Sequence, residues 1–418
     1  MSNNNKGNVF AIAIMFFLFA MISFVTGLQN PMGIIAKAQF GATNLMSQLG
    51  NAANFIAYAF MGLPAGFLLK GKGYKFTALA AITIGFVGVG ISYLSGVFSS
   101  FAVYLLGAFV SGFSMCMLNT VVNPLLNTLG GGGNRGNQLI QLGGSCNSLA
   151  ATIVPVLAGY LIGEVTEKTQ VADVNPALFI AMAIFALAFA IIFFSNIPEP
   201  ELEAAAAEGK IEKEGTLDSI KGALSHKNLV FGVIAIFLYV GIEVGIPNVA
   251  NLYMTSADGL GIAAGVAGTL VGAYWFLMLC GRLVGGAIGG KVSSRTMMIS
   301  VSSAAILFIL LGMFLPTNWT ISLLEANVPV AIIFFVLCGL CTSVMWGAVF
   351  NLAVEGLGKY TSIASGLFMV MVCGGGILPL VQGAVADKAG YINSYWVLIA
   401  ALAYILWFAL IGSRTNKK

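Results

Sequence analysis

The chain has 418 residues, of which 59% are hydrophobic and 8% are charged, and its net charge is +4. Soluble domains carry roughly 25% charged residues, so the composition excludes a soluble protein, and the apolar content excludes a disordered chain. The composition therefore predicts a membrane protein that crosses the bilayer many times.

Long apolar runs divide the chain into twelve predicted helical spans, each near the roughly 20 residues that cross a bilayer core. Breaks at charges and at Gly, Pro and Asn clusters place them at about 9–38, 45–69, 75–98, 100–129, 137–164, 175–197, 228–255, 261–290, 296–315, 328–357, 361–386 and 391–413. Membrane β-strands alternate over about ten residues, so these runs exclude a barrel. The first run is too long for a cleaved signal peptide.

Basic residues gather in alternate loops. With the N-terminus in the cytoplasm, the outside loops hold Lys37, Lys168 and Lys388, and the inside loops and tails hold Lys6, Lys70, Lys72, Lys75, Arg135, Lys210, Lys213, Lys221, Lys227, Lys291, Arg295, Lys359, Arg414, Lys417 and Lys418. Because Lys and Arg concentrate in cytoplasmic loops, we expect both termini to be cytoplasmic.

Residues 198–227 are rich in Glu and Lys and predict a cytoplasmic linker between two bundles, residues 1–197 and residues 228–418. The two halves repeat motifs in the same order: Gly62-x-x-x-Gly66 and Gly281-x-x-x-Gly285, Asn123 to Asn127 and Asn351 to Glu355, and Pro155 and Pro379. Each half has six predicted spans, as in parallel repeats that rock against each other around a central path. The pattern therefore predicts an all-α membrane protein of two six-helix bundles that works as a transporter.

Four segments resemble one family. They are Leu118-Asn-Thr-Val-Val-Asn123-Pro124, Asn147-Ser148, Tyr239-Val-Gly-Ile-Glu243 and Gly374-Gly-Gly-Ile-Leu-Pro379, and they look like the fucose permease branch of the major facilitator superfamily. The resemblance implies the major facilitator fold, import of hexoses with H⁺ or Na⁺, and a monomer in the bacterial inner membrane. This chain departs from the branch at two positions where the family has carboxylates. The family motif Leu-Asn-Asp is replaced by Leu28-Gln29-Asn30, and the family motif Leu-Glu-Thr is replaced by Leu118-Asn119-Thr120. The family glutamine in the fifth span aligns with Gly144, and Gln141 lies one turn away.

Polar stripes mark the predicted path. Amides both donate and accept hydrogen bonds, as sugar hydroxyls require, and aromatic rings suit the apolar face of a sugar. The candidate sugar-binding residues are Gln29, Asn30, Asn51, Asn54, Asn119, Asn123, Gln141, Asn147, Asn248, Trp275, Trp346 and Asn351. The alternative for the amides is hydrogen bonding between helices, which we favour for Asn127 near the membrane surface.

Two charges, Glu243 and Arg282, lie inside predicted spans and away from their ends. Glu243 lies about 22 Å from the start of the seventh span at 1.5 Å per residue, and is the predicted ion-coupling residue for H⁺ or Na⁺. The alternative roles of Glu243 are to bind a sugar hydroxyl or to form a hydrogen bond that stabilises a hinge beside Pro247. Arg282, in the cytoplasmic half of the eighth span, is predicted to pair with Glu355 as a conformational latch. No cation is expected at mid-membrane, so the pattern favours a neutral solute.

Other function classes fit less well. The six cysteines lie in apolar runs, so neither a disulfide framework nor a metal site is expected, and His226 is alone in the linker. We expect no enzyme activity, cofactor, nucleic acid or ATP site. The predicted function is cation-coupled import of a neutral monosaccharide such as fucose, glucose or galactose by alternating access. The alternatives are an uncoupled facilitator and a carrier of another small polar solute such as a sugar derivative.

Overall fold

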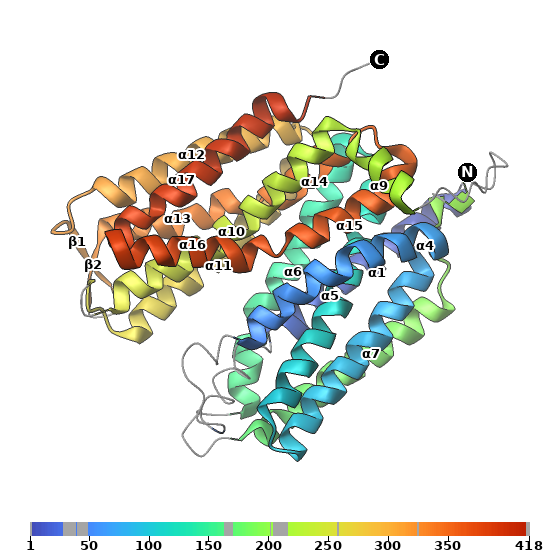
Figure 1. Cartoon of the computed structure of the whole chain (residues 1–418), viewed down its shortest axis with the longest axis horizontal. Coiled ribbons are helices and arrows are strands. Elements are labelled where there is room, and N and C mark those ends of the chain that lie inside the picture. Colours follow the sequence, from blue (N-terminus) through green and yellow to red (C-terminus); the bar gives the residue numbers. More distant parts are fainter. Residues whose placement is uncertain are drawn as a thin grey trace. The chain divides into compact units, whose positions relative to one another are not determined.

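The computed structural model describes residues 2–27, 39, 49–162, 170–200, 202–203, 216–256, 259–323 and 326–414, and these are mostly helical (Figure 1). They form two compact units. The first contains residues 1–129, 146–223 and 357–370, and the second contains residues 130–145, 224–356 and 371–418. Each unit therefore includes a short segment from the opposite half of the sequence. The predicted division at residues 197 and 228 stays a prediction.

The helices follow the apolar runs. The elements up to the linker are α1 (Ser2–Gly27), α4 (Leu49–Val97), α5 (Phe101–Leu129), α6 (Gly133–Ile162), the 3₁₀ turn η1 (Val171–Val174) and α7 (Asn175–Phe194). Those after it are α9 (Thr216–Leu224), α10 (Lys227–Thr255), α11 (Ala264–Ile288), α12 (Ser294–Phe314), α13 (Val330–Thr342), α14 (Met345–Val354), η2 (Gly358–Tyr360), α15 (Thr361–Met371), α16 (Gly374–Ala389), α17 (Tyr391–Trp407) and the π-helical turn η3 (Phe408–Gly412).

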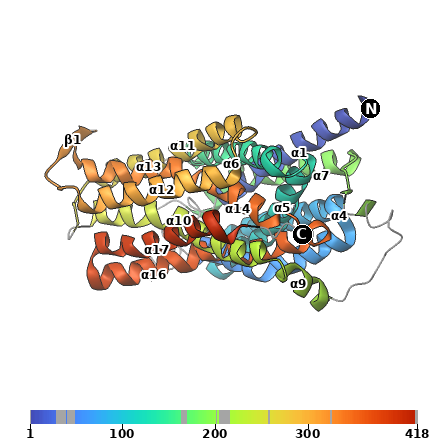
Figure 2. The same cartoon turned by 90° about the horizontal axis from the view of Figure 1, so that it is seen from above.

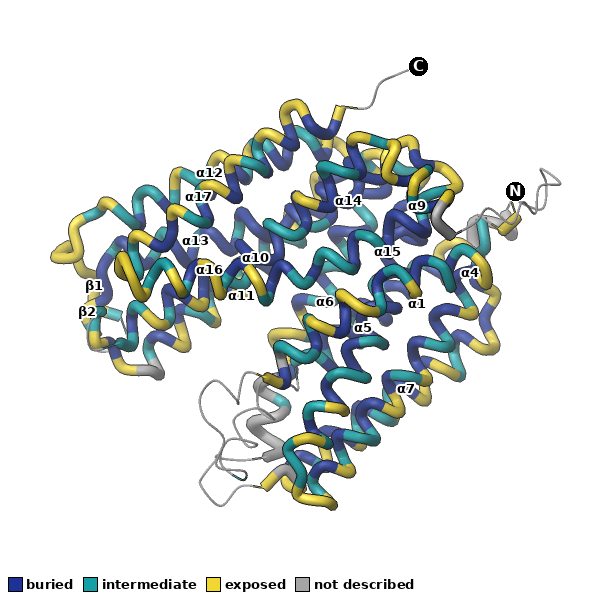
Figure 3. Tube along the Cα trace, viewed as in Figure 1, coloured by how far each residue is buried: buried dark blue, intermediate teal, exposed yellow. Residues whose placement is uncertain are grey.

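Within the described residues, ten helical stretches are long and apolar enough to cross a membrane. One of them, Ala52–Val97, contains the predicted second and third spans, and the more polar helix α6 corresponds to the predicted fifth span. The twelve predicted spans thus each find a helix. Exposed positions run along α7 (Figure 3). They include large apolar residues such as Phe194, which is 85% exposed. A lipid-facing surface has this character, because lipid tails are as apolar as these side chains and solvate them well.

A short β-hairpin departs from the all-α prediction. Strands β1 (Thr320–Leu323) and β2 (Ala326–Pro329) pair antiparallel, with Thr320 opposite Pro329 and Ile321 opposite Val328. The hairpin joins α12 to α13 at one end of the second unit (Figure 2). The run Thr-Ile-Ser-Leu alternates apolar and polar residues, which is the period of a strand rather than of a helix.

Helix breaks separate two of the predicted spans and divide two others. In α4 the backbone of Gly73 has φ 83° and ψ −179°, a conformation that favours glycine, and it separates the predicted second and third spans. The predicted tenth span is divided into α13 and α14 at Ser343 and Val344, and the eleventh into α15 and α16 at Val372 and Cys373. Broken helices leave backbone carbonyls available to side chains, and this occurs in the site below.

Residues 357–370 in the first unit and residues 130–145 in the second come from the opposite half of the sequence. Glycines allow each of these segments to contact its own unit closely. In the first unit, a Cβ on Gly366 of α15 would lie 2.5 Å from the carbonyl oxygen of Gly62 and 3.0 Å from the Cα of Gly66, both on α4. In the second unit, the side chains of Leu142 and Gln138 on α6 pack against Gly286 and the glycines that follow it. Only helices without a Cβ at these positions approach so closely.

The start of the linker is anchored to the first unit by Glu199. Its two carboxylate oxygens accept hydrogen bonds from the backbone N–H groups of Tyr74 (2.7 Å) and Lys75 (2.8 Å), directly after the break at Gly73. Lys75 in turn donates from its Nζ to the carbonyl oxygen of Ser195 (2.7 Å). Glu199 therefore caps the helical segment that follows the break, where the helix dipole favours a negative charge.

Candidate functional site

In the first unit, Tyr58 of α4 and Asn119 of α5 form a polar pair. The Asn119 Nδ2 donates to the Tyr58 Oη (3.1 Å) and to the Met115 carbonyl oxygen (3.1 Å). Since the phenol accepts in this bond, its own O–H can still donate, and the Asn119 Oδ1 can still accept. Asn119 is only half-buried. The pair therefore offers one donor and one acceptor side by side, which is the pattern that a sugar hydroxyl complements.

The other predicted amides of these helices are more deeply packed. Asn54 is 5% exposed and lies against Gly112 of α5. Asn123 is fully buried, and its Nδ2 donates to the Asn119 carbonyl oxygen (2.8 Å). Both positions suit contacts between or within helices. Pro124, which lacks an N–H, leaves the carbonyl of residue 120 without its helical donor, and the Ser365 Oγ donates to that oxygen (3.0 Å).

Asn147 of α6 donates from its Nδ2 to the Phe19 carbonyl oxygen of α1 (3.1 Å), a bond between helices. Gln29 and Asn30 lie outside the described residues, and the side chain of Asn51 is outside them too. The roles predicted for these three residues stay predictions.

In the second unit, Pro247 organises the surroundings of Glu243. Proline has no N–H, so the carbonyl of Glu243, four residues earlier in α10, lacks its helical donor. The Tyr274 Oη of α11 donates to that oxygen (3.1 Å) and also lies 3.1 Å from the Thr342 Oγ1 at the end of α13. Tyr274 is 1% exposed. A buried acceptor that the proline has freed is thus satisfied by a hydroxyl of the neighbouring helix α11.

Arg282 brings a cation to Glu243. The Arg282 Nη2 lies 3.4 Å from the Glu243 Oε1, and the two side chains are 11% and 15% exposed. Its Nη1 donates to the Gly144 carbonyl oxygen of α6 (3.1 Å), and its Nε donates to the Ser343 carbonyl oxygen at the α13–α14 break (3.3 Å). One guanidinium therefore contacts α10, α6 and the break between α13 and α14.

Two sequence-based expectations are corrected here. The predicted partner of Arg282, Glu355, has an exposed side chain just beyond α14, and its carbonyl accepts from the Asn228 Nδ2 (2.9 Å). Arg282 forms its ion pair with Glu243 instead, because the long side chain of Arg282 reaches the middle of α10. The expectation of no cation at that depth is also wrong. Since the two charges compensate each other, the site still favours a neutral solute.

The remaining predicted residues of this unit divide into two groups. Gln141 is 2% exposed and donates to the Val344 carbonyl oxygen (2.7 Å), while Asn351 is 7% exposed and donates to the Ser294 Oγ (2.8 Å), so both stabilise helix contacts. Asn248 and Trp275 are exposed, and Trp346 is half-buried with its ring centre 6.3 Å from that of Tyr239. Trp346 thus lies next to the residue one turn before Glu243.

Sequence reasoning missed Tyr274, Thr342 and the carbonyl groups of Gly144 and Ser343. A proline four residues after an acidic residue signals a freed carbonyl, but no sequence pattern says which hydroxyl will reach it. The carbonyls take part because of a helix break and a distant arginine, and both depend on tertiary packing.

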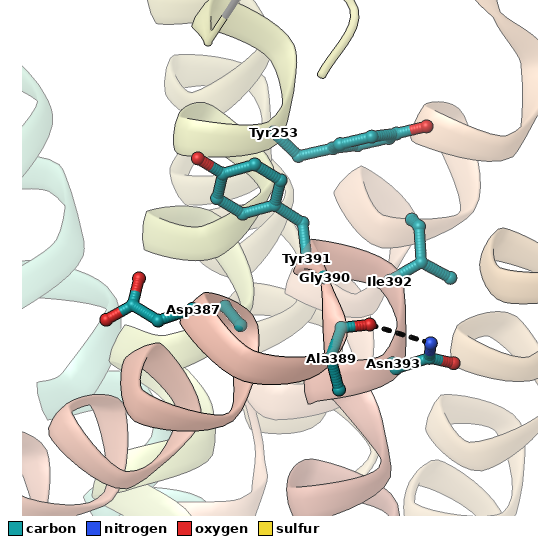
Figure 4. A pocket seen from close by; sticks show the side chains of 8 residues that line it. Tyr253, Asp387, Ala389, Gly390, Tyr391, Ile392 and Asn393 are labelled. Carbon is teal, nitrogen blue, oxygen red and sulfur yellow. Dashed lines mark hydrogen bonds between the residues drawn. The ribbon is translucent and has the colours of Figure 1, made fainter. Parts of the chain in front are cut away.

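A separate cavity of about 420 Å³ lies where α16 turns into α17, lined by Tyr253, Ala386, Asp387, Ala389, Gly390, Tyr391, Ile392 and Asn393 (Figure 4). The rings of Tyr253 and Tyr391 have centres 6.0 Å apart. Figure 4 shows Asp387 and Asn393 pointing to opposite sides, so their polar groups do not converge on one ligand position. Within the described residues, no group of three or more His, Cys, Asp or Glu side chains is placed to hold a metal ion.

Comparisons with known proteins agree with this architecture. A glucose/galactose transporter of Brucella abortus is 28% identical over 419 residues, covering 99% of this chain and 97% of that protein. The L-fucose-proton symporter of Escherichia coli is 23% identical, covering 99% and 96%. A crystal structure of the E. coli fucose:proton symporter superposes with a TM-score of 0.83 at 20% identity, covering 98% of this chain and 100% of that one, which shows the fold.

The family match itself spans both halves of the sequence. Residues 12–379 match the Major Facilitator Superfamily, and this range includes the polar pair of the first unit and the Glu243 site of the second. The resemblance noted in the sequence is confirmed, together with the helical membrane fold that it implied. The chain therefore belongs to the Major Facilitator Superfamily and is an integral membrane transporter of that fold.

Proposed function

We propose that this chain is a secondary active transporter that imports a neutral hexose, such as glucose, galactose or fucose, together with a cation by alternating access. The proposal is supported by relatives of matching length named as a glucose/galactose transporter and as an L-fucose-proton symporter. The structural observation that supports a neutral solute is that the polar groups of the candidate sites have no net charge. Glu243 and Arg282 compensate each other, and the polar pair Asn119–Tyr58 offers only neutral donors and acceptors.

In this proposal the amide and hydroxyl of Asn119 and Tyr58 bind sugar hydroxyls, with Gln29, Asn30 and Trp346 as further candidates. Glu243 binds the coupled cation. The deeply buried Asn123, Gln141 and Asn351 hold helices together instead. We place the protein in a bacterial inner membrane with cytoplasmic termini, because the basic residues concentrate in the loops that this orientation puts inside.

Counterflow in proteoliposomes tests the solute class without requiring a gradient. Vesicles loaded with an unlabelled sugar are diluted into a trace of the same labelled sugar, and exchange is followed for D-glucose, D-galactose, L-fucose and an anionic control, D-glucuronate. We expect exchange of at least one neutral hexose and none of D-glucuronate. Exchange of the sugar acid in preference to all the hexoses contradicts the proposal.

A further inference from the structure

One end of the second unit carries two arginines on neighbouring helices. Arg295 is in the first turn of α12, and Arg414 follows the π-helical turn η3 that ends α17. The helices α12 and α17 lie side by side (Figure 1). The Arg295 Nη2 donates to the Oγ of Ser413, the residue directly before Arg414, at 3.3 Å. Two guanidinium groups are therefore brought to neighbouring positions at this end.

The contacts that hold the two arginines leave most of their donors available. The Arg414 Nε donates to the Leu410 carbonyl oxygen (3.0 Å), so both arginines stabilise the end of one helix, where the dipole favours positive charge. Among the described residues, each guanidinium makes one hydrogen bond in this way and neither forms an ion pair. A guanidinium presents a planar fork of donors that matches a phosphate group. The two arginines can therefore still bind an anion.

The position of Arg295 also favours an anion. The first turn of a helix has unsatisfied N–H groups and the positive end of the helix dipole, so a cation there is unfavourable and an anion is favourable. The first turn of α12 contains Arg295 and no acidic residue. The Ser293 Oγ accepts from the Thr296 N–H (3.1 Å) and satisfies one of these donors. A negative group beside Arg295 would compensate the charges that remain.

An exposed apolar face of α17 leads to the arginines. Ala403, Trp407, Leu410 and Arg414 recur at intervals of three or four residues, which is the spacing of one helix face, and all four are exposed. Ile411, beside them, is 56% exposed. Tryptophan is typical of the boundary between the bilayer core and water. The face thus changes from apolar to positively charged at the level of Trp407, in the order that a phospholipid presents its acyl chains and its phosphate.

We propose that this end of α12 and α17 binds a phospholipid with an anionic headgroup, such as phosphatidylglycerol. An acyl chain lies along Trp407, Leu410 and Ile411, and the phosphate accepts hydrogen bonds from Arg295 and Arg414. A zwitterionic lipid binds less well, because its ammonium group places a further positive charge beside two arginines. In the proposed orientation this lipid belongs to the cytoplasmic leaflet. The site concerns lipid binding and does not depend on which solute is carried.

Lipid binding to the purified protein in detergent tests the proposal. Phosphatidylglycerol and phosphatidylcholine with the same acyl chains are titrated, and the Kd of each is measured by native mass spectrometry. The variants are Arg414→Gln, Arg295→Gln and the two together. The matched control is Lys388→Gln, which removes one exposed positive charge in the last turn of α16, at the opposite end of α17. A parallel arm compares the rise in unfolding temperature caused by phosphatidylglycerol with that caused by inorganic phosphate.

We expect the wild type and Lys388→Gln to bind phosphatidylglycerol more tightly than phosphatidylcholine. Each arginine substitution should weaken the binding of phosphatidylglycerol about 5-fold, and the double substitution about 25-fold, which is the usual contribution of basic residues at an anionic membrane surface. The affinity for phosphatidylcholine should change far less. Inorganic phosphate should raise the unfolding temperature less than phosphatidylglycerol does, because it makes no contact with the apolar face.

Four results would overturn the proposal. They are equal wild-type affinity for the two lipids, unchanged affinity of the double variant for phosphatidylglycerol, a loss in Lys388→Gln as large as that in Arg414→Gln, and an effect of inorganic phosphate as large as that of phosphatidylglycerol. The last of these would assign the arginines to a soluble anion. If Arg295→Gln does not fold, Arg414→Gln still decides, because Arg414 is exposed and its bond to Leu410 lies within its own helical turn.

Discussion

Replacing Gly366 with alanine tests the close contact between α15 and α4 in the first unit. The added Cβ would lie 2.5 Å from the Gly62 carbonyl oxygen and 3.0 Å from the Gly66 Cα, and both neighbours are backbone atoms that cannot rotate away. The helices must therefore separate. Overpacking of this kind costs about 1–3 kcal/mol, which shifts an equilibrium by about 5–150-fold. We expect Gly366→Ala to destabilise the packing seen here by this amount.

The assay compares unfolding temperature in detergent and sugar counterflow rate with those of Gly90→Ala. Gly90 lies on α4 too, but no atom lies within 4 Å of the position its Cβ would take, so its replacement controls for the general effect of alanine in a helix. Gly366→Ala should unfold at a lower temperature than Gly90→Ala and exchange sugar at a different rate. Equal values for the two variants would refute the reasoning from close helix contact.

Three further substitutions follow from the contacts. Tyr274→Phe removes the donor to the carbonyl freed by the proline in α10, so we expect a loss of about 1–3 kcal/mol in the free energy of unfolding, measured by chemical denaturation. Asn119→Ala should weaken hexose binding in detergent at least as much as Tyr58→Phe does, and unchanged affinity would assign Asn119 to packing. Glu199→Ala should cost about 0.5–2 kcal/mol through loss of a helix cap, with exposed Glu203→Ala as the neutral control. Burial raises the pKa of the Glu199 carboxyl group, so the folded protein binds a proton at this group more tightly than the unfolded chain does. Protonation of Glu199 therefore adds to the free energy of unfolding as pH falls, and this contribution is lost as pH rises. The Glu199→Ala variant should lack this part of the pH dependence of stability.

Much of the fold follows from composition and from breaks in apolar runs. The break near residue 73 is a good example, because a glycine between two lysines marks both a loop and a backbone angle that favours glycine. The β-hairpin was missed because four-residue strands are too short to stand out beside spans of twenty or more residues. The break at Ser343 was missed for a different reason. No proline or charge marks it, and it is stabilised by side chains from other helices.

The sequence predicts only part of the site, because single residues can be recognised in it but their partners cannot. An acidic residue in an apolar span is conspicuous, and Glu243 does lie at a contact between several helices. Its partner could not be read from spacing, since Arg282 and Glu355 matched each other in expected depth while tertiary packing placed Arg282 beside Glu243. The amides show the same limit. Asn119 and Asn123 share a stripe, yet one is half-buried beside Tyr58 and the other is fully buried against its own helix.

Concentrative uptake tests the central claim most directly. Proteoliposomes that contain the purified protein are given a labelled hexose with an inward H⁺ gradient, an inward Na⁺ gradient or neither. The account predicts that the internal hexose concentration rises above the external one under one of the two gradients and only equalises without a gradient. A hexose that equalises under all three conditions, or that does not enter at all, would contradict cation-coupled sugar import.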